Sequence, residues 1–513
     1  MVCLFNDGIS LPLWELYRDM YTDVRSAVKV NGTLSREFKE LVGIRQGAGT
    51  SSGCFRRRGT DGLMQLSSLE ESYKIGTIQV GAPTCADDTI MLSTTIMGAQ
   101  LQLSLAEHNA NCHRFQFSDK KTKVMVMNSK SFDLLEPFEL NGKMIEFSNE
   151  EKHLGIHRTI DGKNKITVTE RVKAGRRACY KYMSAGMHGF NGTGLKVSMH
   201  LWKICVLPSM IHSLEALILE KSDFKILEVY QKTFLRQVQH LPTSTATPAL
   251  YLLSGDIPFE GHVHMRMLTF FVRMINRNMI EKDIILRQLS LKGLKDYSWV
   301  MEVRKLLWKY ELPSVFDIVV SPPGKESWKY EVKKAVQKYW LEELKKESEK
   351  FKSLKFLNLE ACKVGKVHPV WDIIDPSMVE QANVQAKLLV QRYPLHGLPC
   401  SGRNRSDTCP LCKEDIETLQ HFLLDCPKLE STRKPYVNKI IDMVLGHMII
   451  TKESMVQVVL DPSVLVLEPF LQKRLATIAR KLCFILHHER ILQLGGGSSF
   501  LMIRNRLQKS IMC

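Results

Sequence analysis

The spacing of apolar and polar positions predicts a mixed first part of the chain and a mainly helical remainder. Residues 13–24 form a helix-like stretch. The runs 27–30 and 38–42 flank Asn31-Gly32, a pair that favours a tight β-hairpin turn. Two short runs, 77–80 and 89–93, flank Cys85-Ala86-Asp87-Asp88. We therefore expect helices and strands together in the first 150 residues.

From residue 169 to residue 312 the pattern is helical, with interruptions at the glycine- and proline-bearing stretches 189–194, 242–248 and 255–258. A linker-like stretch, 313–324, precedes one long predicted helix with Ser327 as its N-cap. Its aromatic and apolar residues recur at helical spacing, which favours burial in a core over a base-stacking surface; they are Trp328, Val332, Ala335, Val336, Tyr339 and Leu344.

The chain is strongly basic. It has 71 Lys and Arg and 54 Asp and Glu, which gives a net charge of +17 over 513 residues. The excess is concentrated. Residues 165–203 and residues 470–513 each carry eight Lys or Arg against a single Glu. Clustered positive charge favours a polyanion such as nucleic acid, because cations displace the counterions condensed on phosphates. The alternative is a solvated basic face without a partner.

The 13 cysteines and the lack of an export signal favour a reducing compartment. No apolar run reaches the ~18 residues of a membrane span, and Asp7 lies where a signal peptide would be cationic. We expect an intracellular chain, cytoplasmic or nuclear, that is not secreted and has no membrane partner. Scattered cysteines such as Cys85, Cys205 and Cys483 are interpreted as reduced core thiols.

Two adjacent carboxylates, Asp87 and Asp88, form the first candidate site. They repel one another at the bend of an apolar hairpin, and a divalent cation would relieve that repulsion. Polymerases and nucleases hold two Mg²⁺ ions with such carboxylates. The dipeptide alone fits an ordinary solvated turn better.

A glycine-rich stretch, residues 43–53, contains Arg45, Gln46 and Gly47. Its glycines permit close backbone approach to a ligand, and the Arg45 and Gln46 side chains could donate to a phosphate or a base edge. It does not fit the Walker pattern, and a mobile surface loop is an equal alternative.

Cys409, Cys412, His421 and Cys426 have the spacing of a metal site, C-x₂-C-x₈-H-x₄-C. Three thiolates and one imidazole complete a tetrahedral zinc shell, which indicates a structural site. A short helix over residues 418–424 would present His421. Cys400 is an alternative ligand with poorer spacing.

Lys173, Arg176, Arg177 and Lys181 recur at three- and four-residue steps and therefore share one helical face. Tyr180 and Tyr182 lie among them, as on surfaces that follow a phosphate backbone. A solvated helix face is the alternative.

Taken in order, these features resemble the reverse transcriptase of a non-LTR (LINE-type) retrotransposon. Residues 43–47 are similar to the family's Arg-Gln-Gly motif at the template and nucleotide site. Cys85-Ala86-Asp87-Asp88 resembles the aromatic-Ala-Asp-Asp hairpin that binds Mg²⁺. Lys121, within Lys120–Val124, matches a segment near the nucleotide triphosphate, and residues 153–156 resemble the Leu-Gly primer grip. The Cys/His cluster is similar to the family's zinc knuckle.

Three departures from the family are visible. Cys85 stands where the family has an aromatic residue. The family's first catalytic Asp precedes the helix expected at residues 13–24, and Asp7 does not fit that motif. We expect no N-terminal endonuclease domain in this chain, in contrast to the family. The resemblance therefore implies an N-terminally truncated chain with an incomplete catalytic set.

The resemblance implies an α+β chain with a partial right-hand polymerase palm, followed by a mainly helical part and a zinc knuckle. Its expected domains are a palm remnant (residues 1–150), a thumb-like helical domain (151–245), a helical connector (246–395), the zinc knuckle (396–430) and a basic helical tail (431–513).

The implied function is RNA-directed DNA synthesis on an RNA template with a DNA primer or target and dNTPs as partners. Asp87 and Asp88 would hold catalytic Mg²⁺, Zn²⁺ would be structural, and the basic helix would hold the duplex. The alternative is a non-catalytic, zinc-containing RNA- or DNA-binding remnant. A third interpretation is an untranslated relic.

Overall fold

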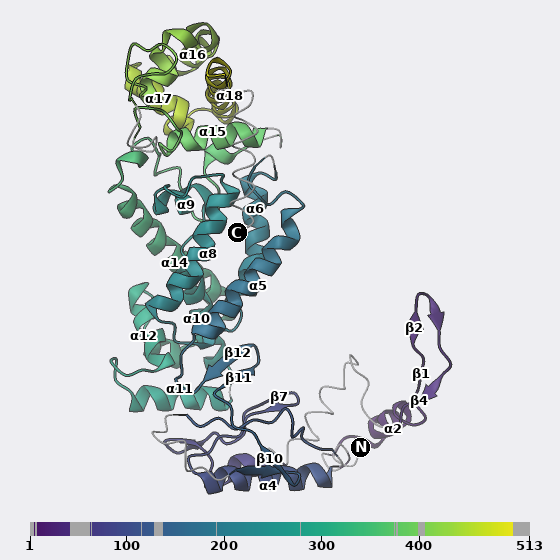
Figure 1. Cartoon of the computed structure of the whole chain (residues 1–513). Coiled ribbons are helices and arrows are strands. Elements are labelled where there is room, and N and C mark those ends of the chain that lie inside the picture. The colour runs from purple at the N-terminus through teal and green to yellow at the C-terminus, as the bar shows by residue number, and fades with distance from the viewer. Residues whose placement is uncertain are drawn as a thin grey trace. The chain divides into compact units, whose positions relative to one another are not determined.

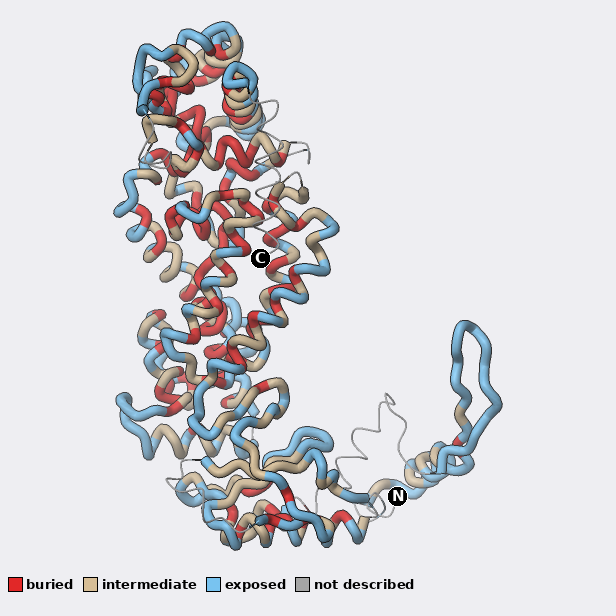
Figure 2. Tube along the Cα trace, in the orientation of Figure 1, coloured by how far each residue is buried: buried red, intermediate tan, exposed pale blue. Residues whose placement is uncertain are grey.

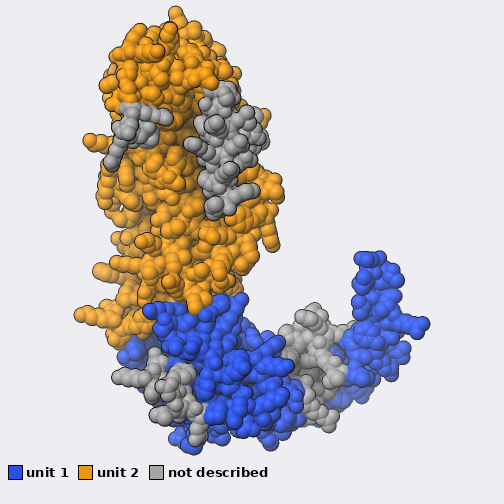
Figure 3. Space-filling view, in the orientation of Figure 1, with its two compact units in different colours: residues 1–163, 279–292 blue, residues 164–278, 293–513 orange. Residues whose placement is uncertain are grey.

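The computed structural model describes residues 5, 8–41, 62, 64–113, 115–127, 137–190, 192–277, 279–373, 375, 378–398 and 406–495 (Figure 1). It divides into two compact units (Figure 3). The first unit comprises residues 1–163 and 279–292, and the second comprises residues 164–278 and 293–513. The predicted α+β class is confirmed, with helices predominating and each described sheet being a two-stranded antiparallel pair. The palm itself stays a prediction.

The first unit holds all the described strands and three of the described helices. The helices are α2 (Leu11–Met20), α4 (Ile96–Cys112) and α11 (Ile280–Leu291). The strands are β1 (Arg25–Ser26), β2 (Lys29–Val30), β3 (Thr33–Leu34), β4 (Phe38–Lys39), β5 (Lys74–Ile75), β6 (Ile78–Gln79), β7 (Thr84–Cys85), β8 (Asp88–Thr89), β9 (Phe138–Leu140), β10 (Lys143–Ile145), β11 (Glu150–His153) and β12 (Ile156–Thr159).

The Asn31-Gly32 hairpin is confirmed. Strand β2 pairs with β3 across this turn, and β1 pairs with β4 further from it. Both turn residues have positive φ, 48° for Asn31 and 87° for Gly32, which is the conformation that favours Asn-Gly here. The hairpin is exposed along nearly its whole length (Figure 2).

The core of the first unit forms around α4. Leu103 on this helix packs with Phe138, Leu140 and Ile145 of the β9–β10 hairpin. Gln102, fully buried beside Leu103, donates its side-chain amide to the Ser72 hydroxyl and to the Leu92 carbonyl. The segment that carries Asp87 and Asp88 is therefore anchored at its base to the buried face of α4.

The second unit is helical. Its α-helices are α5 (Lys165–Met183), α6 (Leu195–Leu201), α7 (Leu207–Ile211), α8 (Lys221–Val238), α9 (Thr247–Ser254), α10 (Phe259–Ile275), α12 (Trp299–Lys309), α13 (Val315–Val320), α14 (Lys325–Ser348), α15 (Val379–Leu389), α16 (Glu430–Val444), α17 (Lys452–Leu460) and α18 (Pro469–Gln493). A π-helical turn (Trp202–Val206) joins α6 to α7. None of the described helices is long and apolar enough to cross a membrane.

Aromatic side chains hold the second unit together. Trp202 stacks on Phe234 with 4.5 Å between ring centroids, which joins the α6–α7 segment to α8. Trp328 of α14 is buried and donates its indole N–H to the Leu268 carbonyl of α10. The prediction that the aromatic stripe of the long helix belongs to a core is therefore confirmed (Figure 2).

Two sequence-based details were wrong. The long helix α14 begins at Lys325 with Gly324 as its N-cap, and the Ser327 hydroxyl donates to the Gly324 carbonyl from within the first turn. The stretch expected to be a linker contains the short helix α13. Ser314 and Asp317 cap its start reciprocally, a capping box that stabilises even so short a helix.

Candidate metal centre and nucleic-acid interface

The Cys/His cluster is built on a small hairpin followed by a helical turn. Thr408 and Ile416 pair across the hairpin, and the Cys409 N–H donates to the Asp415 carbonyl. Lys413 has φ of 62°, which closes the turn just after Cys412. The π-helical turn His421–Asp425 then presents His421, close to the helical segment expected at residues 418–424.

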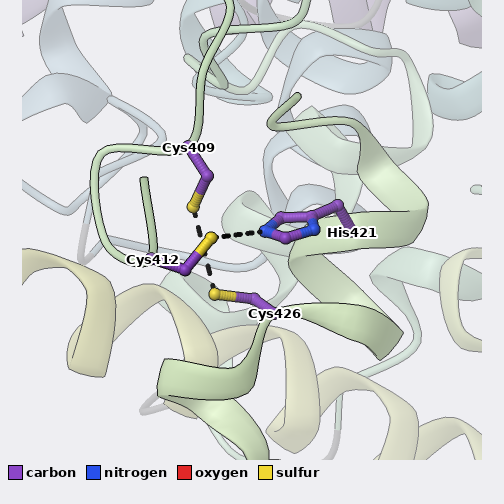
Figure 4. A group of neighbouring side chains, drawn as sticks. All are labelled: Cys409, Cys412, His421 and Cys426. Carbon is purple, nitrogen blue, oxygen red and sulfur yellow. Dashed lines mark hydrogen bonds between the residues drawn. The ribbon is translucent and has the colours of Figure 1, made fainter. Parts of the chain in front are cut away.

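These elements bring all four predicted ligands together (Figure 4). The ligand atoms lie within 4.8 Å of one another, with 3.9 Å between the Cys409 and Cys426 Sγ atoms. The Cys412 Sγ lies 3.4 Å from His421 Nε2. A tetrahedral zinc ion with Zn–S bonds of about 2.3 Å and a Zn–N bond of about 2.0 Å would separate its ligands by roughly 3.5–3.8 Å. The donor set and its spacing therefore fit zinc.

The thiols are arranged for metal binding in a low-dielectric site. Burial raises the pKa of Cys409, and it raises the pKa of Cys426 to about 12. Burial acts in the same direction on Cys412, but hydrogen bonds with the backbone N–H groups of Glu414 and Asp415 and with the Cys409 and Cys426 thiols together outweigh it and lower the pKa of Cys412. Since zinc binds the thiolate form, a bound cation would supply the charge that keeps these buried sulfurs deprotonated.

The surroundings of the knuckle contain a feature that sequence reasoning missed. Arg490 of α18 donates from Nε and Nη2 to the Glu417 carboxylate at 2.7 and 3.0 Å. Both residues are buried, and Glu417 lies between the hairpin and His421. Tyr393 stacks on Phe422, and the Arg490 guanidinium lies over the Tyr393 ring. The buried Glu417–Arg490 ion pair therefore joins the knuckle to α18.

The basic helix is α5, and its four predicted cations are exposed on one face. Lys173, Arg176, Arg177 and Lys181 are all exposed, as is Tyr180. Lys173 pairs with Glu170 at 2.7 Å, and the Arg176 guanidinium lies 5.7 Å from the centre of the Tyr230 ring. The predicted shared face is confirmed, while its partner stays a prediction.

The second basic segment, residues 470–513, is only partly exposed in its described part. Arg480 is buried and donates to the Val370 and Asp372 carbonyls, and Arg490 is committed to Glu417. These two charges hold the fold together instead of facing a polyanion. Residues 496–513, which carry the last cations of that segment, lie outside the described residues.

Asp87 and Asp88 lie at the tip of the β7–β8 hairpin. Cys85 pairs with Asp88, and Ala86 has φ of 57° in the turn. Both aspartates are exposed. Among the described residues the one group of three or more ligand-type side chains close enough to hold an ion is the Cys/His cluster, so this pair does not form a complete metal site there.

Of the remaining predicted site residues, only some lie among the described residues. Lys121 is exposed in a turn in which its N–H donates to the Ser118 carbonyl. Leu154 and Gly155 form the turn between β11 and β12, both with positive φ. Arg45, Gln46 and Gly47 lie outside the described residues, as does Cys400.

The prediction of core thiols is confirmed for Cys483, which is buried, and wrong for Cys85, which is exposed in a two-residue strand with no core against it. Cys205 is intermediate. All nine described cysteines are free thiols.

No protein-family model matches this chain, and no curated protein matches it at a significant level.

Proposed function

We propose that this chain is part of a reverse transcriptase of a non-LTR retrotransposon and acts on an RNA template paired with a DNA primer. Asp87 and Asp88 would bind Mg²⁺ and support nucleotidyl transfer from dNTPs. The observation that carries the proposal is the exposed acidic pair at the turn of a tight antiparallel hairpin whose base is anchored by the buried Gln102. That placement suits a divalent cation shared with a substrate phosphate.

Two-metal catalysis needs a carboxylate beyond this pair, because one ligand must bridge the two ions. The described residues bring no such third group to Asp87 and Asp88. We therefore propose that the chain alone turns over weakly and that the missing carboxylate would come from outside the described residues. Arg45, Gln46 and Lys121 would position template and nucleotide, as the resemblance implies.

A second candidate function is nucleic-acid binding without turnover. It is favoured by the exposed basic face of α5, where Arg177 and Lys181 have no ion-pair partner among the described residues. Positive charge on one helical face with an exposed tyrosine matches the chemistry of a surface that follows a phosphate backbone.

Primer extension separates the two functions. The full chain, Mg²⁺, dNTPs and a primed RNA template are combined, and the variant Asp87→Asn/Asp88→Asn is compared with Glu70→Gln/Glu71→Gln, another adjacent acidic pair of the same unit. We expect weak extension that the aspartate variant abolishes and the glutamate variant retains. Extension that survives in the aspartate variant would show that the pair is not catalytic.

Binding is tested separately on α5. Replacing Lys173, Arg176, Arg177 and Lys181 by Ala should weaken duplex binding and flatten its salt dependence, because each lost phosphate contact lowers the slope of log K against log[salt] by about 0.9. The matched control replaces four exposed lysines of α14, namely Lys329, Lys333, Lys334 and Lys338. Equal losses in both variants would reject α5 as a specific interface.

A further inference from the structure

A cavity of about 380 Å³ lies beside the zinc knuckle, between the His421–Asp425 turn, α16 and the start of α17. Leu424, Val437 and Met455 contribute an apolar wall, and Arg433, Lys434 and Lys452 contribute three cations. A cavity with an apolar wall and a few convergent charges is the usual form of a small-ligand site. Its volume lies at the lower end of that class.

The carboxylates at this cavity are already paired. Asp425 accepts from Lys452 at 2.9 Å and from the Gln420 side chain at 2.9 Å. Glu430 accepts from Arg433 Nη2 at 2.6 Å. No carboxylate of the described residues lies within ion-pair distance of Lys434. The cavity therefore retains an excess positive charge.

Arg433 provides an independent sign of a missing partner. Its side chain is buried, with 4% exposed, yet its Nη1 has no hydrogen-bond partner in the described part of the chain. A buried guanidinium donor without an acceptor is costly, and an anionic oxygen is the acceptor it binds most strongly. The first turn of α17 also reaches the cavity at Thr451 and Lys452, and a helix start favours an anion there.

We propose that this cavity binds one nucleotide of single-stranded RNA or DNA, an inference that rests on the proposed nucleic-acid function. The base lies against Leu424, Val437 and Met455, and its phosphate lies at Arg433, Lys434 and Lys452. The apolar wall favours a base over inorganic phosphate. A single strand is required because the bases of a duplex are stacked and paired inside it, whereas an unstacked base can enter a cavity.

Zinc bound at the Cys/His cluster would stabilise one wall of this cavity. Leu424 and Asp425 belong to the turn between the ligands His421 and Cys426. An ion held by these two residues would restrain the turn between them and with it Leu424 and Asp425. Removal of zinc should therefore weaken binding of the single strand even when α16 and α17 stay helical.

The test measures binding of the full zinc-loaded chain to a short labelled single-stranded RNA, a duplex of the same length and a phosphodiester strand with abasic sites throughout. We expect Lys434→Ala to weaken single-strand binding about tenfold, the effect of losing one charged hydrogen bond, and to leave duplex binding unchanged. Lys439→Ala is the matched control, because Lys439 is exposed on the same helix and does not line the cavity. The abasic strand has no bases to enter the cavity. Its affinity for the wild type should therefore be no higher than the affinity of the RNA for the Lys434→Ala variant.

The proposal is overturned if Lys434→Ala binds the single strand like Lys439→Ala, if the abasic strand binds as tightly as the RNA, or if the duplex is weakened equally. These outcomes leave the α5 interface standing, because that interface is tested by duplex binding to its own variant. If the wild type binds neither single strand nor duplex, both proposals are wrong.

Discussion

Arg490 shows how strongly a single buried charge can be committed to the zinc module. Its guanidinium and the Glu417 carboxylate are buried together, and each satisfies the other. We expect Arg490→Met to destabilise the zinc-loaded chain by about 3–5 kcal/mol, because it leaves the buried Glu417 carboxylate with the His396 N–H as a donor but without a countercharge. Urea unfolding of the second unit, followed by helical circular dichroism, measures this loss.

The matched experiment removes both charges. The double variant Arg490→Met/Glu417→Gln should recover much of the lost stability, since no charge is then left uncompensated. The exposed pair Lys346–Glu343 is a control, and Lys346→Ala should leave the unfolding free energy nearly unchanged, because water screens an exposed ion pair. A double variant as unstable as the single one would show that packing of Arg490, and not its charge, matters.

The ligands themselves give a second prediction at this scale. Cys412→Ser should abolish stoichiometric zinc binding and melt the knuckle, since structural zinc contributes about 10–16 kcal/mol of binding free energy to such modules. Zinc content by mass spectrometry and hydrogen exchange over residues 406–430 measure the two effects. Cys112→Ser, at an exposed cysteine outside the cluster, should change neither. Retained zinc in the Cys412→Ser variant would contradict the assigned ligand set.

The cluster of Cys409, Cys412, His421 and Cys426 could be predicted from the sequence because the spacing of these residues is local and their chemistry is specific to metal sites. The buried ion pair of Arg490 with Glu417 could not be predicted. The two residues are 73 positions apart, and the excess of cations around Arg490 predicted an exposed, nucleic-acid-binding surface instead. The prediction that Cys85 is buried was wrong in the other direction, because this residue is exposed. Its apolar neighbours Ala82 and Met91 do pack against a small core, but Cys85 itself lies further out, in the exposed two-residue strand β7 near the tip of the hairpin.

At the scale of the elements, helix α5 crosses α7 at a glycine. A Cβ added at Gly175 would lie 2.2 Å from the Met210 Cγ, within a fully buried side chain. Ala is normally the better helix former by about 1 kcal/mol. Here we expect Gly175→Ala to destabilise the chain by about 1–3 kcal/mol, because the fully buried Met210 side chain must be displaced to make room for the added methyl group. Thermal or urea unfolding measures the difference.

A double-mutant cycle isolates this contact. In the background Met210→Ala, which removes the clashing atoms, Gly175→Ala should be neutral or stabilising. Equal destabilisation in both backgrounds would place the strain elsewhere. Helix α5 also carries the exposed cations. Duplex binding by the Gly175→Ala variant therefore tests whether that basic face needs the close contact between α5 and α7.

Elements with a strong local signal were predicted well. The Asn31-Gly32 hairpin, the glycine that ends α9 and the buried stripe of α14 each follow from residues close in sequence. Gly255 has φ of 65°, and a Cβ there would meet the Lys366 carbonyl oxygen at 2.0 Å. Helix α13 was missed because its proline-rich flanks suggested a linker, whereas its capping box lies in only four residues.

At the scale of the whole molecule, several histidines are folded into the second unit in the neutral state. Burial lowers the pKa of His240 and His264 to about 3 and that of His487 to about 4, with nearby lysines Lys387 and Lys309 acting in the same direction. The unfolded chain binds these protons near pH 6.5. Stability should therefore fall as pH drops below 6.5, by up to about 4 kcal/mol per pH unit for three sites.

Unfolding free energies between pH 5 and 7, at constant excess zinc, test this slope. His264→Gln should reduce the slope by about one proton, or roughly 1.4 kcal/mol per pH unit. His447→Gln, at an exposed histidine, should leave it unchanged. A slope that is identical in the wild type and the His264→Gln variant would contradict a neutral buried His264.

Helix α11 has a consequence for the order in which the molecule can be completed during synthesis. Residues 279–292 belong to the first unit, where α11 contacts β5, although residues 164–278 of the second unit are translated before them. Strand β5 therefore leaves the ribosome before its partner helix is made. The contact with α11 can form only after residues 279–292 have also emerged, more than a hundred residues after the end of the first unit's main segment at residue 163. A nascent chain arrested before α11 would therefore expose the side of β5 that this helix covers in the complete chain.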